Sequence, residues 1–284
     1  MRDLDKLSTQ KLIELFNETT NEIHKEIKNK KSTIYKICSL AIKVIKRANT
    51  VFYVGAGTSG RIGLVDALDF WPTFNEKNWF KYSIAGGDEA VLSSLEQNED
   101  NFELGISDVF RNEVKEGDLI IGLSASANTK YVNGFLSQAK RQGCHTVLIT
   151  NKAKGDCYEN SDIVLFLDLG DELIEGSTRL KAATAQKIVL NTISSITAIK
   201  HNKVYENMMV EVNPINEKLV KRSIEIIKKI TACEEEVAKK TYFESEKNIK
   251  LSCIIIKKEV DLETAKKILR KNENNLRKAL EDDN

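Results

Sequence analysis

The sequence has few of the residues that bind metals, break helices or form disulfides. Its 284 residues include two prolines, five cysteines and three histidines. No two cysteines form a Cys-x-x-Cys pair and the histidines lie far apart, so we expect reduced thiols and no metal site. No run of about 18 apolar residues is present, and the first residues are charged, so we expect neither a membrane span nor a signal peptide. These absences predict a cytoplasmic protein.

A net charge of one sign is also missing. The chain has 43 basic and 42 acidic residues, which gives a formal charge of +1. A dedicated nucleic-acid surface is normally basic, so we expect no nucleic-acid partner. The hydrophobic content of 41% is that of a globular protein, and the length allows one large domain and a smaller one.

The most informative segment, residues 51–63, reads Val-Phe-Tyr-Val-Gly-Ala-Gly-Thr-Ser-Gly-Arg-Ile-Gly. It predicts a buried strand, then a turn rich in glycine and hydroxyl groups, then a helix. The backbone N–H groups of such a turn converge on an anion, and the helix dipole favours negative charge. The hydroxyl groups of Thr58 and Ser59 add donors, so the turn is a candidate anion site.

Two other interpretations of this turn remain open. Its Gly-x-Gly-x-x-Gly spacing is typical of dinucleotide sites, which also need an acidic residue about 20 positions on, at the end of a second strand. The nearest acidic residues, Asp69 and Glu76, do not end a plausible strand, and the Gly-Lys-Ser/Thr of a P-loop is absent. The hydroxyl groups favour one terminal phosphate. A turn that only packs a helix on a strand is the alternative.

A second strand, polar turn and helix occupy residues 119–142, with Ser126 and Thr129 in the turn. Parallel strands bring such turns to the same edge of a sheet. Further strands are predicted at 82–85, 145–150 and 162–167, and helices fall at 8–48, 61–70, 89–97 and 101–114. The first of these helical regions begins with Ser8 as its N-cap, and the helix at 61–70 ends near Pro72. Five strands that mostly alternate with helices predict an α/β fold with a parallel sheet.

Acidic residues cluster where the helix at 89–97 ends. Asp88 is the expected N-cap of this helix, and Glu96, Glu99 and Asp100 lie at its other end. Negative charge near a helix C-terminus is unfavourable by roughly 0.3–1 kcal/mol for each group. The cluster is therefore a candidate site, and a solvated acidic loop is the alternative.

The last third of the chain holds a long apolar helix and then a helical region. Ser177 or Thr178 is the expected cap of a helix that reaches about His201. Arg179 and Lys181 near its start can hold an anion or be plain surface charge. Beyond residue 216, four short helices at 216–231, 234–247, 261–271 and 273–281 flank an apolar segment at 249–256.

Several runs together resemble a known family. They are residues 54–61, the Ile-Ala-Gly-Gly at 84–87, Gly-Ser-Thr-Arg-Leu-Lys-Ala at 176–182, residues 184–191 and residues 203–212. Read together, they resemble a sugar isomerase (SIS) domain and, more closely, the N-acetylmuramic acid 6-phosphate etherases, over essentially the whole chain.

The resemblance implies an SIS-type three-layer sandwich with a five-stranded parallel sheet and a small helical C-terminal domain. The implied regions are N-terminal helices at 1–48, an SIS domain at 49–212 and the small domain at 213–284. The implied activity is a lyase reaction without a cofactor or metal, in which the lactyl ether of N-acetylmuramic acid 6-phosphate is eliminated and water is added. A homodimer with a shared active site is expected, and the helix at 182–199 is a candidate interface.

Residue by residue, the resemblance makes Glu99 the base and Asp69 the acid, where the family has glutamate. Ala127 stands where the family has glycine. The resemblance leaves open a sugar-phosphate-binding regulator without turnover, a related isomerase, and a lyase for another 3-O-substituted sugar phosphate. The predicted substrate-binding residues are Gly57, Thr58, Ser59, Arg61, Ser126, Thr129, Glu172, Ser177, Arg179 and Lys181.

Overall fold

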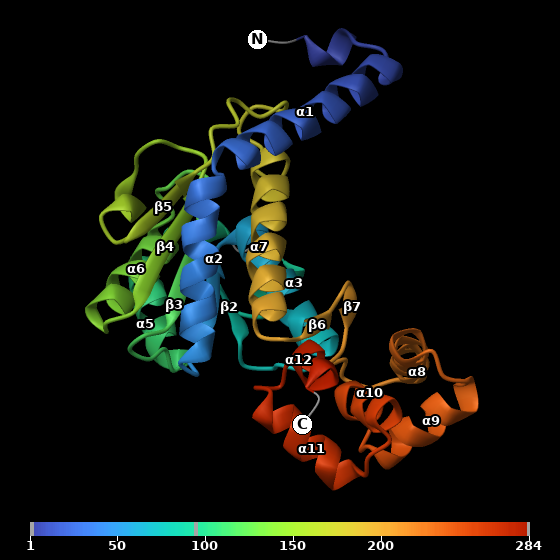
Figure 1. The fold of residues 1–284 in the computed structure, drawn as a ribbon. Helices are drawn as coiled ribbons and strands as arrows, with labels where there is room; N and C mark the ends of the chain where they lie inside the picture. The colour runs from blue at the N-terminus through green and yellow to red at the C-terminus, as the bar shows by residue number, and fades with distance from the viewer. Residues whose placement is uncertain (1–2, 94–95, 283–284) are drawn as a thin grey trace. The chain divides into compact units, whose positions relative to one another are not determined.

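The structure is a computed structural model that describes residues 3–93 and 96–282 (Figure 1). The chain divides into two compact units. The first comprises residues 1–68 and 78–194, and the second comprises residues 69–77 and 195–284. Helix α3 therefore begins in the first unit and ends in the second.

The first unit is an α/β domain, and its elements appear in the order that the sequence predicts. Its helices are α1 Thr9–Asn29, α2 Lys31–Lys46, α3 Gly57–Phe74 (as far as residue 68), α4 Glu89–Leu92, α5 Phe102–Arg111, α6 Lys130–Arg141 and α7 Lys181–Lys200 (as far as residue 194). Its strands are β1 Val51–Gly55, β2 Phe80–Ile84, β3 Leu119–Leu123, β4 His145–Thr150 and β5 Ile163–Phe166. Short 3-10 helices cover Leu4–Lys6, Glu96–Asn98 and Asp156–Tyr158.

The five strands form one parallel sheet in the order β2-β1-β3-β4-β5. In Figure 1, α2 and α7 lie on one face of this sheet and α5 and α6 lie on the other. The central strands β1 and β3 are buried at every position, which explains why they read as unbroken apolar runs. The predicted three-layer sandwich with a parallel sheet is confirmed.

Helix α7 is apolar at about half of its positions, and most of these apolar side chains are buried. Val189, Leu190 and Ile193 on this helix are fully buried within the chain itself. Four of the five cysteines are also buried, so they act as small apolar side chains. Among residues 3–93 and 96–282, no helix combines the length and the apolar character that crossing a membrane requires.

The second unit is mainly helical. It contains α8 Glu217–Thr231, α9 Glu235–Glu244, α10 Ile249–Lys258, α11 Leu262–Lys271, α12 Leu276–Glu281 and a hairpin of β6 Val204–Tyr205 and β7 Met208–Met209. The apolar segment at 249–256 is itself the buried helix α10, and α8, α11 and α12 contact it. Asp261 caps α11 by accepting a hydrogen bond from the Thr264 N–H at 2.7 Å.

Three local predictions are wrong. Helix α3 does not end before Pro72 but runs through it to Phe74, because the proline removes one N–H donor without stopping the helix. Asp88 has helical backbone angles and makes no side-chain cap bond, and the helix it precedes ends at Leu92. Helix α7 is capped by neither Ser177 nor Thr178, and its actual cap is described with the site below.

Candidate active site

The first glycine-rich turn begins where β1 ends. A Cβ atom on Gly55 would lie 2.7 Å from the backbone nitrogen of Gly60, and one on Gly60 would lie 2.6 Å from Cγ1 of Ile84. These glycines therefore let α3 begin directly against the carboxyl ends of β1 and β2. Gly57 has a φ of +49° and is the first residue of α3. The N–H groups of the first helical turn have no partners within the helix, so they are available to an anion.

The second turn is held together by its own hydroxyl groups. Oγ of Ser124 lies 2.8 Å from Oγ1 of Thr129, and the Thr129 N–H also donates to the Ser124 oxygen. The Asn128 N–H donates to Oγ of Ser126 at 3.2 Å. Ser124 and Thr129 are buried, whereas Ser126 is exposed. The turn therefore has an ordered inner hydroxyl pair and a third hydroxyl that a ligand can reach.

Both turns line one cavity of about 530 Å³, as the adjacent parallel strands β1 and β3 require. This volume is in the range of small-molecule sites, roughly 300–1,000 Å³. Six of the predicted site residues lie in its wall, and five further residues line it with them. The predicted ones are Gly57, Thr58, Arg61, Glu99, Ser126 and Thr129, and the others are Ala85, Ala90, Asp100, Asn128 and Thr178.

Glu99 is fixed to the second turn through both its side chain and its backbone. The Thr129 hydroxyl donates to Oε1 of Glu99 at 3.2 Å, and the Tyr131 N–H donates to the Glu99 carbonyl at 3.0 Å. Glu99 is otherwise exposed, and Asp100 beside it forms an ion pair with Lys130 at 3.6 Å. A carboxylate that can accept a proton therefore lies next to a hydroxyl group of the anion site. The side chain of Glu96 lies outside the described part of the chain.

Arg61 lines the cavity and also organises the segment that leads to Glu99. Its guanidinium donates to the carbonyl oxygens of Ala90, Val91 and Ser93 at 2.7–3.1 Å. These carbonyls lie at the C-terminal end of α4, where backbone acceptors lack partners within the helix. The arginine therefore ties the start of α3 to the loop after α4.

Glu172 and Lys181 lie elsewhere, at the start of α7. The Glu172 carboxylate accepts the N–H groups of Lys181 and Ala182, each at 2.9 Å, and is the actual cap of that helix. Lys181 is buried, donates to the Leu169 carbonyl and pairs with Glu22 at 3.0 Å. Both residues line a second cavity, of about 940 Å³, beside α1. The structure therefore shows a helix-stabilising contact for each of them.

The remaining predicted residues are outside the first cavity. Ser59, Ser177 and Arg179 line neither cavity. Asp69 is exposed on α3, about three helical turns beyond Gly57, and belongs to the second unit.

Of the five lining residues that were not predicted as binding residues, Asn128 and Thr178 have uncharged polar side chains. Asn128 lies between Ser126 and Thr129 in the second turn, and Thr178 lies directly after Ser177. The available signal was the position of Asn128 within the second predicted turn and that of Thr178 next to the predicted residue Ser177.

A buried carboxyl group lies on α3 beyond the turn. Asp66 is 8% exposed and accepts hydrogen bonds from the Asn191 amide and from Oγ of Ser194, the latter at 3.2 Å. Burial raises the pKa of the Asp66 carboxyl above its ordinary value, although these hydrogen bonds and the charge of Lys187 oppose the change. Both hydrogen-bond donors lie on α7, so this carboxyl joins α3 to α7 inside the first unit.

The donor groups of the candidate site suit an anionic organic ligand. They are backbone N–H groups, hydroxyls and one arginine, with carboxylates at one side of the cavity. In the part of the chain that the structure describes, no three His, Cys, Asp or Glu side chains gather as metal ligands would.

The comparisons with known proteins agree with this geometry. Residues 32–140 match the family model described as the glucokinase regulatory protein N-terminal SIS domain. A phosphoheptose isomerase structure from Francisella tularensis aligns with a TM-score of 0.51 at 14% identity, over 70% of this chain and 100% of that one. The first unit therefore has the SIS fold.

The relatives define the family more narrowly. The N-acetylmuramic acid 6-phosphate etherase of Pseudothermotoga lettingae is 40% identical over 99% of this chain and 94% of its own length. The etherase of Clostridioides difficile is 37% identical over 98% of this chain and 91% of its own. The chain belongs to the N-acetylmuramic acid 6-phosphate etherase family.

Proposed function

We propose that this protein is a carbon–oxygen lyase that cleaves the D-lactyl ether of N-acetylmuramic acid 6-phosphate. The products are N-acetylglucosamine 6-phosphate and D-lactate, and the reaction serves cytoplasmic recycling of cell-wall amino sugars. The observation that carries the proposal is the position of Glu99. Its carboxylate accepts a hydrogen bond from Thr129 at the wall of a cavity built on two hydroxyl-rich turns.

The two turns are suited to the 6-phosphate. Thr58 and Ser126, with the free N–H groups of the first turn of α3, supply several neutral donors around one position. A cavity open on one side leaves the rest of the open-chain sugar within reach of Glu99. The phosphate would therefore fix the orientation of the substrate, and C1 to C3 would face the carboxylate.

The proposed chemistry is elimination followed by hydration. Glu99 removes the proton at C2, which is acidic because it lies next to the C1 aldehyde of the open-chain sugar. Asp69 protonates the lactate oxygen as the bond to C3 breaks, which gives an unsaturated aldehyde and D-lactate. Water then adds at C3 and a proton returns to C2. Carboxyl groups carry both protons, so the reaction needs no cofactor.

We further propose a homodimer with a shared active site. Val65 and Leu68 lie three positions apart on α3 and are 46% and 53% exposed, which makes an apolar surface available to a second copy. Most apolar side chains of α7 are already buried within the chain, so α3 supports an interface better than α7 does. Sedimentation of the wild type beside a Leu68→Glu variant tests this, and a concentration-independent wild-type monomer contradicts it.

The activity is tested by measuring D-lactate release from N-acetylmuramic acid 6-phosphate. Glu99→Gln keeps the side-chain shape and removes the base, so lactate release should fall by at least about 100-fold. Glu103→Gln is the matched control, because Glu103 is an exposed carboxylate nearby that does not line the cavity. Equal rates in Glu99→Gln and the wild type would contradict the role of Glu99.

Asp69→Glu tests the acid. Glutamate is the residue that the family resemblance implies at this position, and it extends the carboxyl by one methylene. Lactate release by the wild type would show that the reaction proceeds with aspartate at this position. Release by Asp69→Glu alone would show an intact pocket with an acid that is out of reach.

A sugar-phosphate-binding regulator is the second candidate. The match of residues 32–140 to the SIS domain of glucokinase regulatory protein favours it, and so does the replacement of the acid. Calorimetry with N-acetylglucosamine 6-phosphate separates the two functions. Binding without lactate release from either the wild type or Asp69→Glu would favour the regulator.

A further inference from the structure

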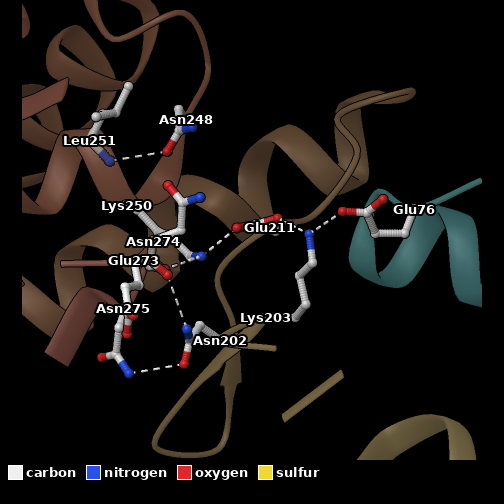
Figure 2. A network of polar contacts seen from close by, with 10 residues as sticks. All are labelled: Glu76, Asn202, Lys203, Glu211, Asn248, Lys250, Leu251, Glu273, Asn274 and Asn275. Carbon is white, nitrogen blue, oxygen red and sulfur yellow. Dashed lines mark hydrogen bonds and ion pairs between the residues drawn. The ribbon is translucent and has the colours of Figure 1, made fainter. Parts of the chain in front are cut away.

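Two lysine side chains are buried in the second unit. The side chain of Lys250 is 1% exposed and that of Lys203 is 7% exposed (Figure 2). Buried ammonium groups lose their hydration, so folded proteins retain them only where carboxylates or carbonyl oxygens surround them. Such a pair in a small helical unit requires a dedicated set of partners.

Glu211 and Glu76 supply these partners. The two carboxylate oxygens of Glu211 bind different lysines, one Lys203 and the other Lys250, and Glu76 binds Lys203 from the other side (Figure 2). Lys250 also donates to the carbonyl of Asn274 at 2.8 Å. Burial lowers the pKa of Lys250, and the nearby Glu211 opposes this effect. The two positive and two negative charges balance within one connected network.

The network joins three segments that are far apart in the sequence. Lys203 precedes the β6–β7 hairpin, Glu211 follows it and Lys250 lies in the first turn of α10. Glu76 is different, because it belongs to the short segment 69–77 that enters the second unit from α3. The Asn213 N–H donates to the Pro72 carbonyl at 3.4 Å and makes a second link to this segment.

The end of α3 needs such external links. Pro72 has no N–H to donate, so the helix lacks one backbone hydrogen bond in its last turns. Asn75 ends the helix with a φ of +56° and donates its N–H to the Trp71 carbonyl at 2.8 Å. The next residue, Glu76, is the one that binds the buried lysine. The contact of Glu76 with Lys203 therefore holds segment 69–77 within the second unit. It lies just beyond Pro72, where the helix lacks a backbone hydrogen bond.

Asp69 is the first residue of this same segment. We propose that Glu76, Lys203, Glu211 and Lys250 form a positioning network that fixes Asp69 relative to the helical unit. This inference rests on the proposed function, in which Asp69 protonates the departing lactate. The four residues do not touch the reacting atoms. They act by holding the backbone that carries the acid.

A positioning role makes a different prediction from a purely structural one. A misplacement of about 1 Å at a reacting group can lower a rate by on the order of 100-fold. Phosphate binding depends on the first unit, so it should not change when the network is weakened. The network variants should therefore lose kcat and keep KM.

Glu76→Gln is the first test, because it removes one charge and keeps the side-chain shape. Its control is Glu235→Gln, which removes the partner of Lys228 in an exposed ion pair of 3.0 Å in the same unit. We expect kcat for lactate release to fall at least about tenfold in Glu76→Gln with KM changed less than about twofold, and Glu76→Asp to recover part of the loss. Unchanged kcat in Glu76→Gln, or an equal fall in Glu235→Gln, would overturn the proposal.

A second substrate tests whether the lost step is acid catalysis. A trifluorolactyl ether releases an oxygen that carries negative charge more readily and so needs less help from an acid. The fall in kcat caused by Glu76→Gln should be clearly smaller for this ether than for the lactyl ether. The same fall for both ethers would mean that the network does not act through Asp69.

Hydrogen exchange tests the anchoring without any activity. Backbone amides in the peptide 69–77 should exchange faster in Glu76→Gln than in the wild type, and Glu235→Gln should not change them. Unchanged exchange in Glu76→Gln would overturn the proposal even if the protein is an active lyase. If Glu76→Gln exchanges faster than the wild type but the wild type releases no lactate, the anchoring stands and only the proposed function is rejected.

Discussion

Each of the two turns of the candidate site contains a residue with positive φ, but the two turns use different side chains there. In the first turn this residue is Gly57, with a φ of +49°, and in the second it is Ala127, with a φ of +61°. A Cβ atom on Gly57 would meet nothing within 4 Å, whereas the methyl group of Ala127 is fully buried. The first turn therefore uses the conformational freedom of glycine, and the second uses contacts.

The contacts of the second turn come from the loop after β4. The Cys157 N–H donates to the Ala127 carbonyl at 3.0 Å, and the Asp156 N–H donates to the Asn128 side chain at 3.0 Å. Gly155 lies against the Ala127 methyl group, where a Cβ atom would be 2.6 Å away. An alanine with positive φ is strained by about 1 kcal/mol, and burial of its methyl group offsets roughly 0.8 kcal/mol. The methyl group of Ala127 therefore fits closely against Gly155.

The largest effect is expected when the close contact in the first turn is broken. In Gly55→Ala, the new Cβ would lie 2.7–3.0 Å from backbone atoms of Ser59 and Gly60, which cannot move without displacing α3. We expect a loss of about 3 kcal/mol in the free energy of unfolding, measured by urea denaturation.

Gly57→Ala is the control for this variant. It adds the same methyl group where nothing lies within 4 Å, so only backbone strain of about 1 kcal/mol should appear. Equal losses in the two variants would show that close packing does not distinguish these glycines.

The next effect concerns the fit between Gly155 and the second turn. In Gly155→Ala, the new Cβ would lie 2.6 Å from the Ala127 methyl carbon and 2.7 Å from the Ala127 carbonyl oxygen. Overpacking of this kind should lower the free energy of unfolding by about 2 kcal/mol. Adding Ala127→Gly should restore at least about 0.5 kcal/mol of it, because one of the three close contacts disappears while those with the Ala127 carbonyl and the Asn128 side chain remain. Strict additivity in the double-mutant cycle would contradict the contact.

The sequence predicted the sheet and both turns because local signals and tertiary packing agree there. In an α/β protein, an unbroken apolar run followed by a turn of Gly, Ser and Thr indicates a buried parallel strand and the turn at its carboxyl end. The acidic cluster that singled out Glu99 was also a local signal, although α4 ends at Leu92 and the cluster lies at a short 3-10 helix instead. These parts of the fold and of the site needed no knowledge of distant contacts.

Other features depend on distant partners and could not be predicted. Glu172 caps α7 from a position nine residues before the helix, so no local capping pattern reveals it. The isoleucines at 254–256 have no helical period, and only the packing of α8, α11 and α12 around α10 decides their conformation. No sequence pattern indicated a role for Glu76, and only the structure shows that it binds Lys203.

Helix α3, which follows the first turn, also carries the buried carboxyl group of Asp66. This group makes the free energy of unfolding depend on pH. The folded pKa of Asp66 is raised, so the folded state binds its proton more tightly than the unfolded chain does. Stability therefore falls as pH rises from the unfolded pKa to the raised folded pKa. Asp66→Asn should remove this fall. Compared with the wild type, its free energy of unfolding should therefore increase by on the order of 1 kcal/mol more between about pH 4 and about pH 7.

Asp66→Ala is the companion variant. It also removes the titration, but it loses the hydrogen bonds with Asn191 and Ser194. It should therefore be less stable than Asp66→Asn at every pH, with the same flat dependence. A pH dependence of unfolding that is the same in the wild type and in Asp66→Asn would contradict the raised pKa.

The smallest effect is expected for Ala127→Gly alone. Glycine relieves about 1 kcal/mol of strain at a φ of +61°, but it loses the buried methyl group and gains freedom in the unfolded chain. These effects oppose one another, so the free energy of unfolding should stay within about 1 kcal/mol of the wild type. N-acetylglucosamine 6-phosphate should bind equally well, because the hydroxyl pair of Ser124 and Thr129 remains. A large loss of stability would show that the methyl group, and not the left-handed backbone, determines the shape of the second turn.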